Sequence, residues 1–258
     1  MRVLMLSKAC LVGSYQTKLE KIGQSEGIEL LAIVPPYWDD PAGRIDLERS
    51  HTNGYTLLAD PIHFNGSYHL HYYPKLKQRL DVFRPHIVHI DEEPYNLATW
   101  LAWRQSRARG AKTLFFSWQN LQRSYPIPFS NMEQQVLAGV DYAIMGNQDS
   151  AEVWHNKGYK GKYKVIPQFG VDPDRFHPPT QKENGGGFVI GSANRRLVRE
   201  KGVDLLLIAA AKLPGIWRLH IAGEGPEKQA LQQLARELGI HKQVHFDGAI
   251  SSDQMPAY

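Results

Sequence analysis

The chain is predicted to be an α/β protein with two doubly wound parallel-sheet domains. Short apolar runs alternate with helical segments through the first 166 residues, which is typical of a parallel sheet with helices on both faces. The alternation stops over a Pro- and Gly-rich stretch and resumes at Phe188. We therefore expect an N-terminal domain over 1–167, a linker over 168–187 and a C-terminal domain over 188–258.

Apolar runs and helical spacing predict the elements of the N-terminal domain in order. The strands are expected at 2–6, 28–34, 55–58, 68–72, 86–90, 112–117, 141–145 and 163–166. The helices are expected at 15–25, 74–83, 94–109, 130–137 and 149–157. Segment 37–53 is polar and has no clear period, so we expect an irregular insertion there.

The C-terminal domain repeats the pattern on a smaller scale. Strands are expected at 188–191, 217–222 and 244–246, with helices at 203–213 and 226–238 and a further helix beginning at Ser252. Three parallel strands in about 70 residues bury little surface, so this domain is expected to be truncated.

Composition restricts the class of protein. Of the 258 residues 42% are hydrophobic, and the net charge is +4. Cys10 is the only cysteine, which excludes a disulfide framework and favours a reducing compartment. No apolar run approaches the eighteen residues of a membrane span, so we expect a cytoplasmic chain, with peripheral attraction to an anionic membrane left open. The spread of Lys and Arg argues against a nucleic-acid partner.

One dense basic cluster interrupts this even distribution. Arg195, Arg196, Arg199 and Lys201 lie within seven residues, between an apolar run and a predicted helix start. Positive charge at a helix N-terminus opposes the helix dipole by about 0.3–1 kcal/mol per charge. The junction between a strand and a helix is also where α/β folds hold phosphate. The cluster therefore indicates an anion site, although on charge alone a solvated basic turn is the more typical interpretation.

Four segments of the sequence form a recognisable series. They are Val165 to Pro178, Arg196 to Gly202, Gly223 to Glu227 and Val244 to Gly248. Together they resemble the GT-B glycosyltransferases of retaining family 4, in which the corresponding segments are the linker signature, the diphosphate loop, the second glycine turn and the next strand. The sequence departs from the family pattern at Arg195, where the family has Gly, and at Trp118, which takes the place of a His beside the reacting sugar. A Glu–seven residues–Glu motif expected farther on is absent.

The resemblance implies transfer of a sugar from a nucleotide sugar, most simply a UDP- or GDP-sugar, with retention of configuration. It implies that Arg196 and Lys201 are catalytic, because two fixed cations stabilise the charge that develops on the departing diphosphate. Arg195, Gly223, Gly225 and Gly13 are expected to contact the donor, although simple turns would also explain the glycines. No metal or other cofactor is expected where side chains supply the charge.

Polar residues that follow two predicted strands are candidates for acceptor binding. Asp91, Glu92 and Glu93 follow the strand at 86–90, and Trp118, Gln119 and Asn120 follow the strand at 112–117. Strand ends of this kind carry ligand sites in parallel sheets. Two alternatives remain open: the acids cap the helix after Pro94, and Trp118 packs beside a polar turn. The acceptor is a glycan, a lipid or a small molecule.

Two other patterns imitate metal sites but are not expected to bind a metal. Asp172 and Asp174 belong to the linker signature, and His69 and His71 lack a third ligand. A truncated second domain also leaves a different hypothesis open. The chain would then be a catalytically incomplete fragment, or half of a split enzyme, whose open sheet edge favours a homodimer or a completing C-terminal polypeptide.

Overall fold

The computed structural model describes residues 1–41, 43–178, 187–251 and 254–258, with the side chain of Arg195 left out. The chain divides into two compact units, Met1–Gly170 and Val171–Tyr258, and each is considered by itself. None of the helices in the described ranges has the length and apolar content that crossing a membrane requires.

The first unit is built on a seven-stranded sheet in the order β5-β2-β1-β6-β7-β8-β9, and every neighbouring pair is parallel. The runs predicted as strands become β1 Arg2–Leu6, β2 Glu29–Val34, β5 Thr56–Ala59, β6 Ile87–Ile90, β7 Lys112–Ser117, β8 Tyr142–Met145 and β9 Lys162–Val165. In β2 every residue from Leu30 to Val34 is buried, which explains the continuous apolar character of that run.

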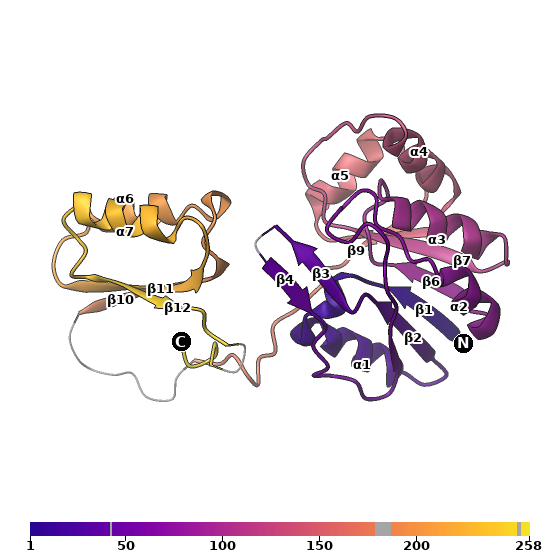
Figure 1. Ribbon diagram of the computed structural model, residues 1–258, viewed down its shortest axis with the longest axis horizontal. Coiled ribbons are helices and arrows are strands. Elements are labelled where there is room, and N and C mark those ends of the chain that lie inside the picture. The colour runs from indigo at the N-terminus through magenta and orange to yellow at the C-terminus, as the bar shows by residue number, and fades with distance from the viewer. Residues whose placement is uncertain (42, 179–186, 252–253) are drawn as a thin grey trace. The chain divides into compact units, whose positions relative to one another are not determined.

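Helices cover both faces of this sheet (Figure 1). Helix α1 Thr17–Gly23 packs on one face, where Leu19 joins residues of β1 and β2 in a buried cluster. On the other face lie α2 Leu76–Phe83, α3 Leu97–Arg107, α4 Phe129–Gly139 and α5 Gln148–Asn156. Strands β2 and β5 lie on one side of β1, and strands β6 to β9 follow in order on its other side. The carboxyl ends of β1 and β6 therefore lie at a topological switch point.

Two expectations for the first unit are wrong. The insertion at 37–53 contains an antiparallel hairpin, β3 Tyr37–Asp40 and β4 Gly43–Asp46, in which Trp38 pairs with Ile45 and is buried. Segment 68–72 is not a strand, because the His71 N–H and ring Nδ1 both lie within hydrogen-bond distance of the Ser67 carbonyl and close a turn. Only an isolated bridge between His63 and Tyr72 remains there.

The second unit has a three-stranded parallel sheet in the order β10-β11-β12, formed by Phe188–Arg196, Trp217–Glu224 and Val244–Gly248. Helices α6 Val203–Ala210 and α7 Lys228–Glu237 lie on one face (Figure 1), where Leu207, Leu231 and Leu219 are buried together.

Strand β10 is longer than predicted and runs through Arg196, which pairs with Glu224 across the sheet. Arg196 therefore ends a strand rather than lying in a loop. The expected helix from Ser252 falls partly outside the described residues, and 254–257 form turns.

Candidate functional site

The first two acids after β6 are buried and held by lysines. Asp91 accepts hydrogen bonds from Ser7 Oγ at 2.6 Å, Lys18 Nζ at 2.8 Å and Gln168 Nε2 at 2.8 Å. Burial by itself raises the pKa of Asp91, but the Lys18 charge, the nearby His89 and the hydrogen bonds from Lys18 and Ser7 hold it below its ordinary value. Asp91 therefore stays charged and ties the loop after β1 to the end of β6.

Glu92 is held by a second set of polar contacts, beside those of Asp91. It accepts the Lys8 N–H at 3.0 Å, while Lys8 Nζ and His71 Nε2 each lie 3.7 Å from its Oε2. Burial opposes ionisation here too, yet Lys8 and His71 keep the pKa of Glu92 below its ordinary value. The Lys8 ammonium also lies 4.7 Å from the ring centroids of Trp38 and Tyr68.

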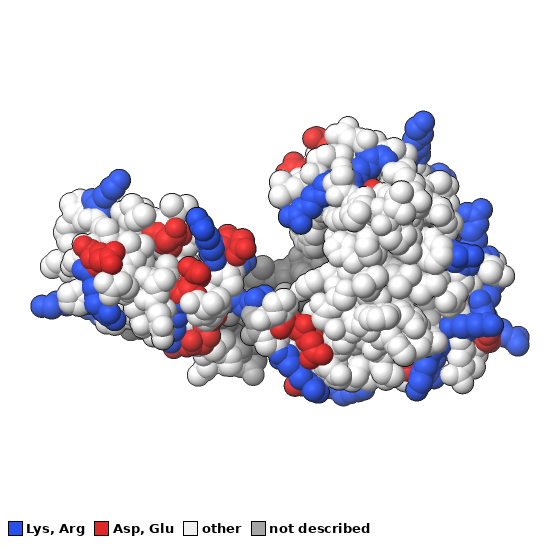
Figure 2. All heavy atoms as spheres, turned by 45° about the horizontal axis from the view of Figure 1, so that its top comes forward, with Lys and Arg blue, Asp and Glu red and all other residues white. Residues whose placement is uncertain are grey.

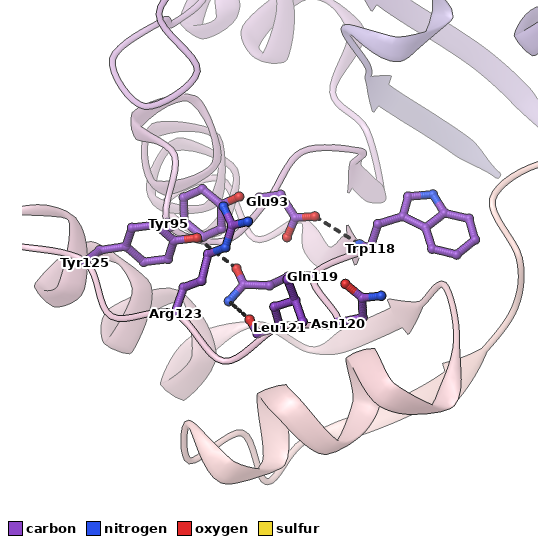
Figure 3. Close-up of a pocket in the computed structure, with 8 residues that line it drawn as sticks. All are labelled: Glu93, Tyr95, Trp118, Gln119, Asn120, Leu121, Arg123 and Tyr125. Carbon is purple, nitrogen blue, oxygen red and sulfur yellow. Dashed lines mark hydrogen bonds between the residues drawn. The ribbon is translucent and has the colours of Figure 1, made fainter. Parts of the chain in front are cut away.

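Glu93 points to a different place, a pocket with a volume of about 220 Å³ at the carboxyl ends of β6 and β7 (Figure 3). Its Oε2 accepts the Ser117 hydroxyl at 2.6 Å and its Oε1 accepts the Trp118 N–H at 2.9 Å. The pocket is lined by Glu93, Tyr95, Trp118, Gln119, Asn120, Leu121, Arg123 and Tyr125.

Four of the six predicted acceptor residues are thus brought together at one pocket, and two are not. Asp91 and Glu92 do not line the pocket, because Lys18 and Lys8 draw their carboxylates into the loop after β1. Burial raises the pKa of Glu93 to about 7, although the hydrogen bonds from Ser117 and Trp118 favour its charged form. One carboxyl group in the pocket is therefore near its midpoint at neutral pH.

Aromatic side chains form the walls of the pocket. The Tyr95 and Tyr125 rings are stacked with centroids 4.1 Å apart, and the Tyr125 hydroxyl donates to Gln119 Oε1 at 3.0 Å. The Trp118 side chain is 40% exposed. Apolar ring faces beside amide and carboxyl groups suit a ligand that has both C–H faces and hydroxyl groups, as sugars do.

Sequence reasoning missed four lining residues, which are Tyr95, Leu121, Arg123 and Tyr125. Tyr95 lies two residues after Glu93, within reach of the same strand end. Arg123 and Tyr125 lie in the segment between β7 and α4, which has no sequence period, so only their nearness to Trp118 along the chain could have indicated them.

The pocket wall is also joined to the start of the predicted linker. Trp118 Nε1 donates to Gln168 Oε1 at 2.7 Å, and Gln168 in turn donates to Asp91. The next residue, Phe169, stacks on Tyr15 with ring centroids 3.8 Å apart. Residues 168 and 169 thus belong to the packing of the first unit.

Gly13 lies near the same sheet edge, and its amide is already engaged. The Gly13 N–H donates to Glu48 Oε2 at 2.6 Å, and an added Cβ would lie 2.9 Å from the Cβ of Ser50. The glycine is required by this close approach. A phosphate at this amide would have to displace the Glu48 carboxylate.

In the second unit, the ends of β10 and β11 bring the basic segment and the glycine turn together. The Leu197 N–H donates to the Glu224 carbonyl at 2.8 Å, and the Glu227 N–H donates to the Leu197 carbonyl at 3.2 Å. An added Cβ at Gly225 would lie 2.7 Å from the Leu197 nitrogen. Gly223 and Gly225 therefore act first by letting the two loops touch.

Three basic residues lie beside this junction in the chain. Arg196 is half-buried at the end of β10, and Arg199 and Lys201 are exposed in a short 3₁₀ turn, Arg199–Lys201. Gly202, with φ 63°, then begins α6, so the cations precede a helix N-terminus. The side chain of Arg195, which is expected to contact the donor, lies outside the described atoms. Figure 2 shows Lys and Arg intermixed with Asp and Glu on the face in view.

Metal-binding clusters of three or more His, Cys, Asp or Glu side chains are absent from the described ranges. Asp172 and Asp174 are joined instead by a turn, in which the Asp174 N–H donates to Asp172 Oδ1 at 3.0 Å.

Comparison with known proteins gives a family match in the second unit. Residues 175–258 match the family model for glycosyl transferases group 1. The chain is 35% identical over 102 residues to a GDP-mannose-dependent alpha-(1-6)-phosphatidylinositol monomannoside mannosyltransferase of Mycobacterium tuberculosis, a match that spans 34% of this chain and 26% of that protein. It is 26% identical over 205 residues to the putative glycosyltransferase EpsD of Bacillus subtilis, covering 69% of this chain and 52% of EpsD.

Solved structures resemble the whole chain. Anabaena Alr3699/HepE in complex with UDP has a TM-score of 0.73 at 16% identity, covering 100% of this chain and 71% of that one. The apo form of the lipopolysaccharide outer core galactosyltransferase WaaB has a TM-score of 0.64 at 18% identity, covering 99% and 70%. The chain therefore has the α/β architecture of GT-B glycosyltransferases, as predicted, and it spans about a quarter to a half of the length of the curated relatives named above.

Proposed function

We propose that this chain acts as a glycosyltransferase that moves a sugar from a nucleotide-sugar donor to an acceptor hydroxyl. The observation that carries the proposal is the match of residues 175–258 to the glycosyl transferases group 1 model, over the same segment that holds the basic cluster and the glycine turn. The names of similar proteins support it, since they include a GDP-mannose-dependent transferase and a UDP complex.

The donor diphosphate is assigned to the ends of β10 and β11. Negative charge grows on the diphosphate as the sugar leaves, so cations fixed at Arg196 and Lys201 stabilise the transition state more than the ground state. Charge-assisted hydrogen bonds contribute about 1.5–3 kcal/mol each, which corresponds to about 10- to 150-fold in rate for each bond. Gly223 and Gly225 support this site by holding the two loops in contact, and Arg195 extends the basic surface.

The acceptor is assigned to the pocket of the first unit. Trp118 and the Tyr95–Tyr125 stack supply apolar faces, and Gln119, Asn120 and Glu93 supply polar groups. This combination suits a glycan, the sugar headgroup of a lipid or another small polyol. Asp91 and Glu92 act indirectly, because they fix the loops around the pocket and do not line it.

Retention of configuration is part of the proposal because of the resemblance to retaining family 4. The test is direct. The anomeric signal of the first product formed, read by proton NMR before mutarotation, is expected to keep the configuration of the donor. The opposite anomer would overturn this part while leaving the transferase assignment intact.

The function is tested by turnover of UDP-glucose and GDP-mannose, with release of the nucleoside diphosphate as the readout. Arg196→Ala is expected to lower turnover at least tenfold. Arg218→Ala is the matched control, because Arg218 is exposed on β11 of the same sheet but outside the proposed site. Equal turnover in wild type and Arg196→Ala would remove the assigned role. Nucleotide binding without any turnover would favour the alternative of a binding module that acts with another polypeptide.

A further inference from the structure

Three consecutive acids follow β6, and the structure gives a cation to only two of them. Lys18 Nζ lies 2.8 Å from Asp91, and Lys8 Nζ lies 3.7 Å from Glu92. Among the residues that the structure describes, no Lys, Arg or His nitrogen lies within 4.0 Å of a Glu93 oxygen. Glu93 is also the one of the three acids that lines the pocket of the first unit. Its charge is therefore left for a bound ligand to balance.

The Glu93 carboxylate is held in a fixed orientation at the pocket (Figure 3). Each of its oxygens accepts one hydrogen bond, from the Ser117 hydroxyl and from the Trp118 N–H. Ser117 is itself fixed, because its oxygen accepts from the buried Trp154 Nε1 at 2.7 Å. A carboxylate has about four acceptor positions, so about two remain for a ligand. The site is therefore formed before the ligand arrives.

The other polar groups of the pocket suit a ligand that carries both an amine and hydroxyl groups. A protonated amine has three N–H donors and needs three acceptors. Glu93 supplies two acceptor positions together with the opposite charge, and the amide of Asn120 lines the same pocket. The volume of about 220 Å³ is below the range of about 300–1,000 Å³ that is usual for drug-sized ligands. We therefore expect a single sugar ring in it.

Arg123 is the one cation among the lining residues, and it favours a different ligand. An acidic sugar, with a carboxylate in place of the amine, would pair with Arg123 and be repelled by Glu93. Arg123 is exposed, whereas Glu93 is partly buried. Ion pairs to an exposed side chain contribute little, because water already solvates the charge. The carboxylate that has lost part of its water gains more from a new partner, so an amine is favoured over an acid.

Protonation of Glu93 gives this preference a measurable signature. Burial and the nearby Glu92 raise the pKa of Glu93, while Ser117, Trp118 and Lys8 lower it, and the resulting pKa is about 7. An adjacent ammonium favours the charged carboxylate, so its binding should release a proton near neutral pH. The charged and titratable groups around Glu93 are Lys8 from the loop after β1, Glu92 and Tyr95 after β6, and Arg123 and Tyr125 between β7 and α4.

We propose that this pocket binds an amino sugar, whose protonated amine pairs with the Glu93 carboxylate. The inference rests on the proposed transferase function, since it makes a hexosamine with a free amine the acceptor or the unit of the acceptor that enters the pocket. The hydroxyl groups of the same ring then face the amides of Gln119 and Asn120. An N-acetylated sugar has no positive charge for Glu93 and is discriminated against.

Calorimetric titration of the full chain, without any donor, tests the proposal at pH 7.5. The probes are D-glucosamine and D-galactosamine, each beside its N-acetylated form, and D-glucuronate as the acidic sugar. Glu93→Gln removes the charge at almost constant size, and Glu93→Asp keeps the charge on a shorter arm. Glu152→Gln is the matched control, because Glu152 is exposed on α5 and outside the pocket.

Wild type is expected to bind at least one of the amino sugars at least tenfold more tightly than its N-acetylated form. Glu93→Gln should erase this preference, Glu93→Asp should keep part of it, and Glu152→Gln should leave it unchanged. At pH 7.0, titration in two buffers of different ionisation enthalpy should show net proton release in wild type and none in Glu93→Gln. A merely structural role of Glu93 would not link proton release to the amine.

Three results would overturn the proposal. They are no detectable binding of either amino sugar, equal affinity of wild type for the amino and the N-acetylated sugars, and tighter binding of D-glucuronate that Arg123→Gln abolishes. Failure of the transferase function gives a different pattern. If the amino sugars bind as expected but wild type neither binds UDP or GDP nor releases them from UDP-glucose or GDP-mannose, the amine site stands and the transferase assignment fails. Turnover of either donor without preference for an amine removes the amine site alone.

Discussion

Gly223→Ala tests whether the contact between the two loops of the second unit depends on a glycine. Gly223 has φ +127°, a backbone conformation that L side chains rarely adopt. An added Cβ would overlap the Asn194 carbonyl oxygen and lie 3.1 Å from the Asn194 carbonyl carbon. The obstacle is backbone rather than a flexible side chain, and it lies where the β10–β11 register shifts between Ala193 and Arg196. The strand ends would have to separate to accept the methyl group.

The expected cost has two parts. Holding a non-glycine residue in a sparsely populated region costs about 1–3 kcal/mol. Forcing a methyl group into a packed contact costs about 1–3 kcal/mol more. Together they predict that Gly223→Ala destabilises the second unit by about 2–6 kcal/mol. Gly191→Ala is the matched control, because Gly191 lies on β10 of the same sheet with no atom within 4 Å of an added Cβ and no unusual φ.

Hydrogen exchange read by mass spectrometry can measure this cost in the intact chain. Amides of β10 and β11 should exchange faster in Gly223→Ala, while those of β1 and β6 in the first unit keep their wild-type protection. The Kd for UDP should rise with the same variant, since Arg196 ends the displaced strand. Equal protection of β10 and β11 in Gly223→Ala and Gly191→Ala would refute the reasoning.

Three further predictions concern buried ionisable groups of the first unit. Burial lowers the pKa of His89 to about 4. Acid is therefore expected to lower the free energy of unfolding, measured in urea, by about 2–3 kcal/mol between about pH 6.5 and pH 4. His89→Leu should make the free energy of unfolding less dependent on pH over this range. Glu93 has the opposite sign, because its raised pKa makes stability fall as pH rises from about 4.5 to 7; Glu93→Gln should therefore be more stable than wild type above pH 7 by about 1–3 kcal/mol, and a less stable variant would contradict this. Lys157→Met leaves the Glu133 carboxylate, 2.6 Å from Lys157 Nζ and 6% exposed, without its partner, and should cost about 3–5 kcal/mol; adding Glu133→Gln should recover part of that loss.

The sheet of the first unit was predictable because buried parallel strands appear in the sequence as apolar runs. The run at Leu30 to Val34 is buried at every position, and the structure places it in β2. The hairpin at Tyr37–Asp46 was not predictable in the same way, since one buried side chain, Trp38, supports it among polar neighbours. Alternation at 68–72 was misleading, because His71 is buried by a turn and not by a strand.

Strand β10 shows a second limit of prediction from sequence patterns. Residues after Ile190 are small or polar, so their pattern carries no strand signal, yet backbone pairing with β11 extends the strand to Arg196. The glycine turn at Gly223 to Glu227 lies beside this segment, and the expected contact of its glycines with the donor stays a prediction. Its glycines are needed where the Asn194 and Leu197 backbones approach.

Sequence placed the candidate pocket correctly at the ends of β6 and β7, since side chains that follow neighbouring parallel strands meet at one edge. It could not separate Glu93 from Asp91 and Glu92. Their separation depends on Lys8 and Lys18, which lie more than seventy residues away in the chain and reach the two other acids through the fold.

The central claim is that the cations at the end of β10 bind a diphosphate, and calorimetric titration with UDP and with uridine tests it most directly. Uridine lacks the phosphates, so only the affinity for UDP should depend on Arg196 and Lys201. The double variant Arg196→Ala/Lys201→Ala is predicted to bind UDP at least a hundredfold more weakly than wild type does. Its weak affinity for uridine is predicted to be unchanged. UDP binding that is equal in wild type and the double variant would contradict the account.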